Sequence, residues 1–178
     1  MARYPKAQWV GASPQDFSTN KIQHKFIIIH VEEGTETGTD AWFHNPAAQV
    51  SAHFGVAKTG HVQQFVDTDD TAWAEGQWNF LGISVEHEGM SGQHLTPQQV
   101  QADKELFQWI HMVYKTRLAL TFDPHDPAGG VIPHGKLPEG ALSHPECPGQ
   151  PIINDVHKLL NEMSGHLLSA DENSKDID

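Results

Sequence analysis

The sequence predicts an α/β fold in which a single mixed, mainly parallel β-sheet is flanked by helices. Residues 25–30 (Lys-Phe-Ile-Ile-Ile-His) form a short apolar run rich in β-branched side chains, which is typical of a central buried strand. Residues 81–87 alternate between apolar and polar side chains, as a strand does. Residues 97–117 carry apolar side chains at helical spacing. Together these segments favour one sheet covered by helices.

The first half of the chain is expected to add a short helix and a β-hairpin. Residues 1–24 are polar and irregular and form an N-terminal extension of the domain. Thr39 can cap a helix that runs to Phe43 and ends before Pro46. Two strand-like segments, 51–57 and 61–66, flank a Lys-Thr-Gly turn, and this arrangement predicts a hairpin.

The alternating strand and the long helix follow in the second half. The alternation places two sets of side chains on opposite faces of the sheet: Ile83, Val85 and His87 on one, and Ser84, Glu86 and Glu88 on the other. In the long helix Thr96 is expected to be the N-cap, and Pro97 suits the first helical position.

The last third of the chain is predicted to be mostly loop. Residues 121–149 are rich in Pro, Gly and His, and long loops of this kind often carry function. A final helix is expected at 152–163 and ends the domain, which spans 1–163. Residues 164–178 are polar and acidic and are expected to form a disordered tail.

Composition excludes some classes of partner. The 178 residues carry a formal net charge of −12, so the chain is a poor candidate for binding nucleic acid or an anionic membrane surface, although such a charge can also simply aid solubility. No apolar run approaches the roughly 20 residues that span a bilayer. The N-terminus lacks the apolar stretch of a signal peptide, which predicts synthesis in the cytoplasm. We expect a monomer.

Three side chains are candidate metal ligands. His30 ends the buried strand, and His134 and Cys147, the only cysteine, lie in the Gly/Pro-rich segment that follows the long helix. Imidazole nitrogen and thiolate sulfur are donors that zinc favours, and a catalytic zinc keeps three protein ligands and one open position. On spacing alone the alternative stays open, namely a buried cysteine and two unrelated histidines.

Six segments resemble, in order, motifs of the zinc amidase superfamily, which includes phage amidase endolysins, bacterial muropeptide amidases and animal peptidoglycan recognition proteins. They are Phe26-Ile-Ile-Ile-His30, the hairpin Ser51-Ala-His-Phe through Val66, Thr71-Ala-Trp-Ala-Glu-Gly76, Asn79 to Gly89 with its Val-Glu-His-Glu-Gly, Leu95-Thr-Pro-Gln-Gln, and the pair Pro133-His134 with Glu146-Cys147-Pro-Gly149. The resemblance spans about residues 25 to 160 and implies the same fold.

The resemblance implies a role for each of several residues. His30, His134 and Cys147 become the ligands of one zinc ion. Glu86 becomes the general base, with Glu88 the weaker choice and an exposed strand glutamate the alternative. His144 is a candidate oxyanion donor, because Pro145 stands where many relatives have lysine or threonine; His144 can equally be a surface residue.

Two further residues are assigned to substrate binding. His53 matches the histidine of the family's hairpin, and Trp73 fits an aromatic wall of a cleft; for both, core packing is the alternative. Ala52 and Ala74 depart from the family, which often has tyrosine and histidine there. His125, in an Asp-Pro-His-Asp-Pro turn, is an unfavoured ligand.

The resemblance implies hydrolysis of the amide between N-acetylmuramic acid and L-alanine in peptidoglycan or muropeptides. The alternatives are a module that binds peptidoglycan without cutting it, a zinc amidase or peptidase acting on another bond, and a structural role without metal. An antimicrobial phage-type endolysin, a delivered effector and a cytoplasmic recycling enzyme all fit as settings, and the lytic setting is favoured by analogy.

Overall fold

The isoleucine run predicted to be a central strand is strand β3 (Phe26–Val31), and all six of its residues are buried. A computed structural model describes residues 2–173. β3 lies between two parallel neighbours in a six-stranded sheet with the order β1-β5-β4-β7-β3-β8. The other five strands are β1 (Gln8–Trp9), β4 (Phe54–Val56), β5 (Val62–Gln64), β7 (Gly82–His87) and β8 (Gly130–Pro133).

The sheet is mixed and mainly parallel, as predicted. Among the described strands of this sheet only the hairpin β4–β5 is antiparallel, and the remaining neighbours run in the same direction. A separate antiparallel pair joins β2 (Phe17–Ser18) to β6 (Thr71–Ala72). The helices are α1 (Glu36–Phe43), α2 (Pro97–Tyr114), α3 (Pro138–Ser143) and α4 (Gln150–Asn173), with short 3-10 helices η1 (Gly76–Leu81) and η2 (His134–Lys136).

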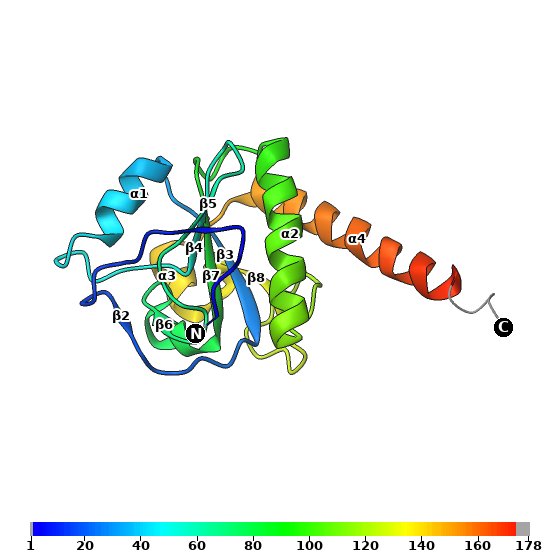
Figure 1. Ribbon diagram of the computed structural model, residues 1–178, viewed down its shortest axis with the longest axis horizontal. Coiled ribbons are helices and arrows are strands. Elements are labelled where there is room, and N and C mark those ends of the chain that lie inside the picture. Colours follow the sequence, from blue (N-terminus) through cyan, green and yellow to red (C-terminus); the bar gives the residue numbers. More distant parts are fainter. Residues whose placement is uncertain (1, 174–178) are drawn as a thin grey trace.

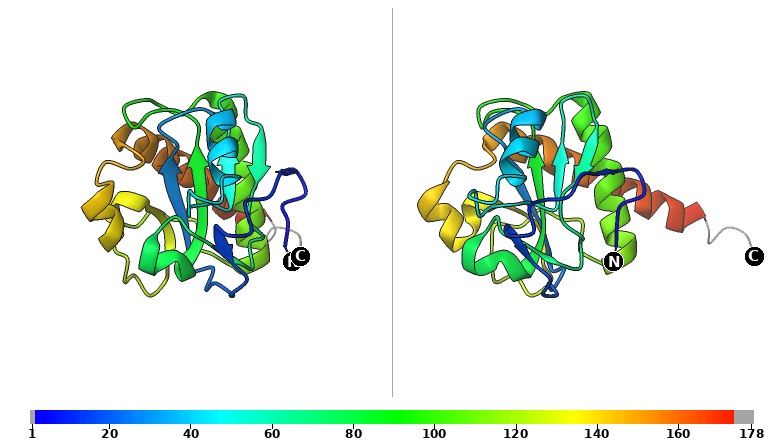
Figure 2. Two further views of the ribbon diagram at one scale, coloured as in Figure 1. Left: turned by 90° about the vertical axis from the view of Figure 1, so that its left-hand side faces the viewer. Right: turned by 60° about the vertical axis from the view of Figure 1, so that its left-hand side comes forward.

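Helices cover both faces of the sheet. Figure 1 shows the strands nearly edge-on, with α1 and α3 on one side and α2 and α4 on the other. The left view of Figure 2 places α1 in front of the strands and α2 behind them. No helix within residues 2–173 is both long and apolar enough to cross a bilayer.

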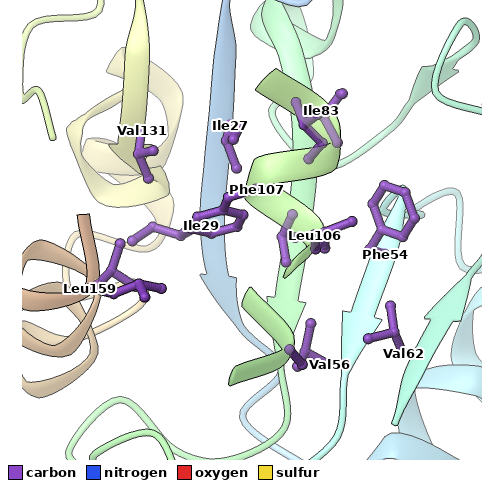
Figure 3. Packing of buried hydrophobic residues seen from close by; sticks show 14 of the residues in the cluster. Ile27, Ile29, Phe54, Val56, Val62, Ile83, Leu106, Phe107, Val131 and Leu159 are labelled. Atoms are coloured by element: carbon purple, nitrogen blue, oxygen red, sulfur yellow. The ribbon is translucent and has the colours of Figure 1, made fainter. Parts of the chain in front are cut away.

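The alternation of side chains along β3 and β7 assigns each residue to one of two environments. Ile27, Ile29, Ile83 and Val85 pack against Leu106, Phe107 and Ile110 of α2 and against the buried face of α4 (Figure 3). Phe26 and Ile28 point to the opposite face, where they pack with Ile132 and Leu137. His30 follows Phe26 and Ile28 by the same parity, so it faces away from the α2 core.

Two expectations about local structure need correction. Helix α1 begins at Glu36 and is capped by the Thr35 hydroxyl, which accepts from the backbone N–H of Gly38; Thr39 lies inside the helix. The segment 121–149 is not a continuous loop, because it holds β8, η2 and α3. β8 was hidden in the sequence because only two apolar residues, Val131 and Ile132, separate its glycine from its proline, a composition that an edge strand tolerates.

The long helix α2 has the predicted start. Thr96 and Gln99 form a capping box, and Pro97 occupies the first turn. Helix α4 continues to Asn173, ten residues past the predicted end at Met163. Residues 174–178 of the expected tail lie outside the described residues, and the domain boundary at 163 stays a prediction.

A buried ion pair joins the sheet to α2. The Nδ1–H of His87 donates to the backbone carbonyl of His30 at 2.8 Å, and its Nε2–H donates to the Asp103 carboxylate at 3.0 Å. Both side chains are fully buried. Burial alone would lower the pKa of His87, but the Asp103 carboxylate and the His30 carbonyl outweigh burial and raise it.

We predict that Asp103→Ala lowers the free energy of unfolding by about 3–5 kcal/mol, because it leaves a buried charged imidazole without its partner. Urea-induced unfolding measures the loss. The matched control is Glu105→Ala on the same helix, where the carboxylate pairs with exposed Lys6 and should contribute less than about 1 kcal/mol. Equal losses in the two variants would contradict a special role for the buried pair.

Candidate metal centre and groove

The predicted ligands converge at the carboxyl ends of three neighbouring parallel strands. His30 is the penultimate residue of β3, and Glu86, the penultimate residue of β7, is its partner in the strand register. His134 follows directly after β8, the other neighbour of β3. Because parallel strands end at one edge of the sheet, this order brings the three side chains together.

Cys147 reaches the same place from the segment between α3 and α4. Its backbone carbonyl accepts from the N–H of Gly135 at 2.9 Å, and its own N–H donates to the carbonyl of His144 at 3.0 Å. These two bonds tie the cysteine to the turn that carries His134. The thiol is partly buried and packs at the margin of the α2 core.

The three donor atoms form one cluster. One ring nitrogen each of His30 and His134 and the Sγ of Cys147 all lie within 4.8 Å of one another. The two imidazole rings are tilted, with centroids 4.4 Å apart. Donors on a tetrahedral zinc are about 3.3–3.6 Å apart, as follows from zinc–nitrogen and zinc–sulfur bond lengths. Two imidazoles and a thiol are a donor set that suits zinc, so the residues fit this metal.

Burial keeps both histidines available as ligands. Desolvation lowers the pKa of His30 to about 3, and repulsion from His87 and His144 adds to this effect. Desolvation likewise lowers the pKa of His134 to about 3, and there repulsion from His30 and His144 adds to the effect. The neutral imidazole is the form that binds a metal. Burial also raises the pKa of the Cys147 thiol, as does the nearby Glu86 carboxylate, and a cation at this position would oppose that rise.

Glu86 stands beside the cluster. Its Oε1 lies 3.7 Å from Nδ1 of His30, and its side chain is 15% exposed, so it reaches the groove while most of it is buried. Burial raises the pKa of Glu86 to about 8, and repulsion from Glu32 adds to the rise. A carboxyl group of this kind can hold or release a proton near neutral pH.

A groove of about 550 Å³ opens over these residues. Its lining includes Thr35, the N-cap of α1, Thr39 and the half-exposed Trp42 within α1, and His144. Three carboxylates line it, those of Glu32, Glu33 and Glu86, and its described lining contains no lysine or arginine.

The exposed side chain of His144 is oriented by its neighbours. The residue caps the C-terminus of α3, and its Nδ1 lies 2.9 Å from the Ser143 hydroxyl. Its ring centroid is 5.7 Å from that of His134. The structure therefore brings His144 to the cluster, where an imidazole N–H can face a bound ligand.

His53 and Trp73 are not brought to the groove. His53 is fully buried: its Nδ1 accepts from the N–H of Ser84 at 3.0 Å and its Nε2 lies 3.1 Å from the carbonyl of Asp70. Trp73 donates its indole N–H to the Ser18 hydroxyl at 3.0 Å and is not among the groove residues. Both nitrogens of His53 are used inside the protein, so its position supports packing rather than ligand contact. His125 packs on Trp78, apart from the cluster.

Sequence reasoning missed Glu75 and Trp42. The Glu75 side chain is fully buried beside His30, with Oε1 3.0 Å from Nε2 of the imidazole. The one signal in the sequence is that Glu75 is the only charged residue in the segment 71–76. Trp42 carried no signal, because an aromatic residue in a short amphipathic helix belongs to the core as often as to a surface.

Most of the chain matches a family of known proteins. Residues 19–150 match the family model described as N-acetylmuramoyl-L-alanine amidase. N-acetylmuramoyl-L-alanine amidase A of Achromobacter lyticus is 38% identical over 87 residues, which are 48% of this chain and 49% of that protein. The chain thus spans about half the length of this curated relative.

Solved structures share the fold. A selenomethionine derivative of AmpD superimposes with a TM-score of 0.66 at 19% identity, over 89% of this chain and 96% of that one. N-acetylmuramoyl-L-alanine amidase LysC from Clostridium intestinale has a TM-score of 0.64 at 18% identity, over 89% and 99%. A Drosophila PGRP-LB variant in complex with tracheal cytotoxin has a TM-score of 0.61 at 16% identity, over 82% and 88%.

Proposed function

Because this chain belongs to the N-acetylmuramoyl-L-alanine amidase family, we propose that it uses one zinc ion to hydrolyse the amide between N-acetylmuramic acid and L-alanine in peptidoglycan. One observation carries the proposal. The donor atoms of the candidate ligands His30, His134 and Cys147 lie close together, Glu86 lies beside His30, and all four residues line one open groove. Three ligands with an open side are the arrangement of a catalytic zinc rather than a structural one.

His30, His134 and Cys147 would hold the zinc, which when bound supplies Lewis acidity that lowers the pKa of a water molecule and polarises the scissile carbonyl. Glu86 accepts the proton of the attacking water at its carboxylate and delivers it to the leaving amide nitrogen. The carbon–nitrogen bond breaks, leaving a carboxylate on the muramic acid and a free amino group on the alanine. His144, which also lines the groove, donates a hydrogen bond to the oxygen of the carbonyl as negative charge develops.

The groove is the proposed place of the substrate. The PGRP-LB variant that shares this fold is described in complex with tracheal cytotoxin, which supports recognition of peptidoglycan fragments by this type of domain. A lytic, endolysin-like role with antimicrobial effect belongs to the same proposal, since a Clostridium intestinale amidase named as an endolysin shares the fold too. A module that only binds is disfavoured, because all three ligands and Glu86 are present together.

We predict that Trp42→Ala raises KM for a soluble muropeptide by about 5- to 30-fold and leaves kcat nearly unchanged, because truncating an aromatic contact typically costs about 1–2 kcal/mol of binding free energy. Trp42 lines the groove with 53% of its side chain exposed. Steady-state kinetics measures both constants. Trp73→Phe is the control, because Trp73 lies away from the groove; an equal rise in KM for both variants would contradict this placement of the substrate.

The test of the function is an analysis of digestion products together with metal content. Purified peptidoglycan is incubated with the protein, and the amino groups set free are labelled and identified. We expect one zinc per chain and L-alanine as the newly exposed N-terminal residue. A different N-terminal residue would assign another scissile bond, binding without release would assign a recognition module, and a protein that takes up no zinc would overturn the mechanism.

A further inference from the structure

We propose that Glu75 is a positioning residue that fixes the orientation and the tautomer of His30 so that Nδ1 of the imidazole is presented to the metal. This inference rests on the proposed zinc site but not on which bond is cut. It assigns a purpose to a carboxylate that the proposed reaction does not use.

The contacts of Glu75 point at a single target. The residue precedes η1, and its backbone N–H donates to Oδ1 of Asn79 at 2.6 Å, which anchors the main chain at this point. Its Oε1 accepts from the Ser84 hydroxyl at 2.5 Å and lies 3.0 Å from Nε2 of His30. Its Oε2 is buried and has no hydrogen-bond partner among the described residues. The carboxylate is therefore held by one hydroxyl and directed to one imidazole.

This geometry determines the proton on His30. A carboxylate oxygen that already receives the Ser84 proton acts as an acceptor, so Nε2 of His30 carries the hydrogen of the 3.0 Å bond. The lone pair of the neutral ring is then on Nδ1, the atom that faces Glu86 at 3.7 Å in the groove. A ligand histidine whose other nitrogen donates to a carboxylate is fixed in both ring orientation and tautomer.

The hydrogen bonds that hold Glu75 continue through Ser84 to His53. The backbone N–H of Ser84 donates to Nδ1 of His53, and Nε2 of His53 donates to the carbonyl of Asp70. His53, Ser84 and Glu75 thus form a continuous series of hydrogen bonds that ends at His30. The buried position of His53 makes sense as the far end of this series.

Burying a carboxylate with one unpaired oxygen costs free energy, so an apolar residue of similar size would be expected if the position served only packing. The hydrogen bond to His30 is what the buried glutamate gains at this position.

The experiment compares Glu75→Ala and Glu75→Gln with the native chain, and Asp16→Asn serves as the matched control. Asp16 is also fully buried, and its Oδ1 accepts from the N–H of Gln49 while Oδ2 is unpaired, but it contacts none of the ligands. The first readout is the tautomer of His30 in metal-free protein, from long-range proton–nitrogen-15 NMR. The second is the zinc dissociation constant, from competition with a chelator.

We expect the Nε2–H tautomer of His30 in the native chain and in Asp16→Asn, and a mixture of tautomers in Glu75→Ala. Zinc should bind Glu75→Ala about 10- to 100-fold more weakly than the native chain, the usual cost of losing an outer partner of a ligand. Glu75→Gln retains an acceptor oxygen but cannot ionise, so the tautomer of His30 should persist and the zinc affinity should lie between those of the native chain and Glu75→Ala.

Two results would overturn the proposal: an Nδ1–H tautomer in the native chain, or a zinc affinity of Glu75→Ala equal to the native one. If Glu75→Ala does not fold, the affinity of Glu75→Gln decides in its place, and a native value overturns the proposal. A native protein that binds zinc but releases no peptide would defeat the proposed function while leaving these readouts intact, so the two failures are distinguishable.

Discussion

Glu86→Gln is expected to lower kcat on muropeptide by about 10²- to 10⁴-fold, the range that a positioned proton-transfer group contributes. Glutamine has nearly the shape of glutamate, so the groove and the ligand cluster should persist. It cannot accept the proton of the water or return it to the leaving nitrogen. Zinc content and KM should therefore stay near the native values, because Glu86 is not one of the three ligands.

The control for this variant is Glu88→Gln, two residues further along the chain. Glu88 shares the parity of Glu86, but its carboxylate accepts from the backbone N–H of Lys58 at 2.7 Å and does not line the groove. Rates are measured by the release of alanine amino groups. A native rate in Glu86→Gln, or an equal loss in Glu88→Gln, would remove Glu86 from the mechanism.

Cys147→Ser should abolish activity by abolishing zinc binding. The serine hydroxyl is a far weaker zinc donor than a thiolate, and removing a ligand should weaken affinity by more than the roughly 10- to 100-fold that an outer partner costs. Metal content after dialysis and chelator competition measure this directly. The fold should survive, because Cys147 is only partly buried at the margin of the core.

His125→Ala serves as the control for metal binding, since His125 packs on Trp78 away from the ligand cluster. It should keep both zinc and activity. If Cys147→Ser retained one zinc per chain with native affinity, the cysteine would not be a ligand, and the metal assignment of His30 and His134 would need another third donor.

The architecture could be predicted from the sequence because it depends on local patterns. The sequence also named His30, His134 and Cys147, whose donor atoms lie within 4.8 Å of one another. The isoleucine run ending in His30 is a buried strand, and the alternation through residues 82–87 places Glu86 on the face opposite the α2 core. The sequence motifs around His134 and Cys147 bring these residues to the same point. The roles of these residues remain proposals until the variants above are measured.

What the sequence could not show depends on contacts between distant segments. Strand β8 is defined by pairing with β3, and few apolar residues mark it. His53 and Trp73 match family motifs, yet both make hydrogen bonds within the protein, to Ser84 and Ser18, and neither lines the groove. The bond from Glu75 to His30 joins residues 45 positions apart, so no local pattern reveals it.

The alternation of side chains along β3 and β7 has a consequence for how this protein can be altered. Positions such as Ile29 and Val85 face the helices, whereas their immediate neighbours His30 and Glu86 face the groove. Alternate residues of the same two strands thus contribute to thermal stability and to the proposed catalytic site. Substitutions at the residues that face the helices can therefore be chosen to raise the stability of the protein while the residues that face the groove stay unchanged. Stability and activity can then be optimised in separate libraries of variants.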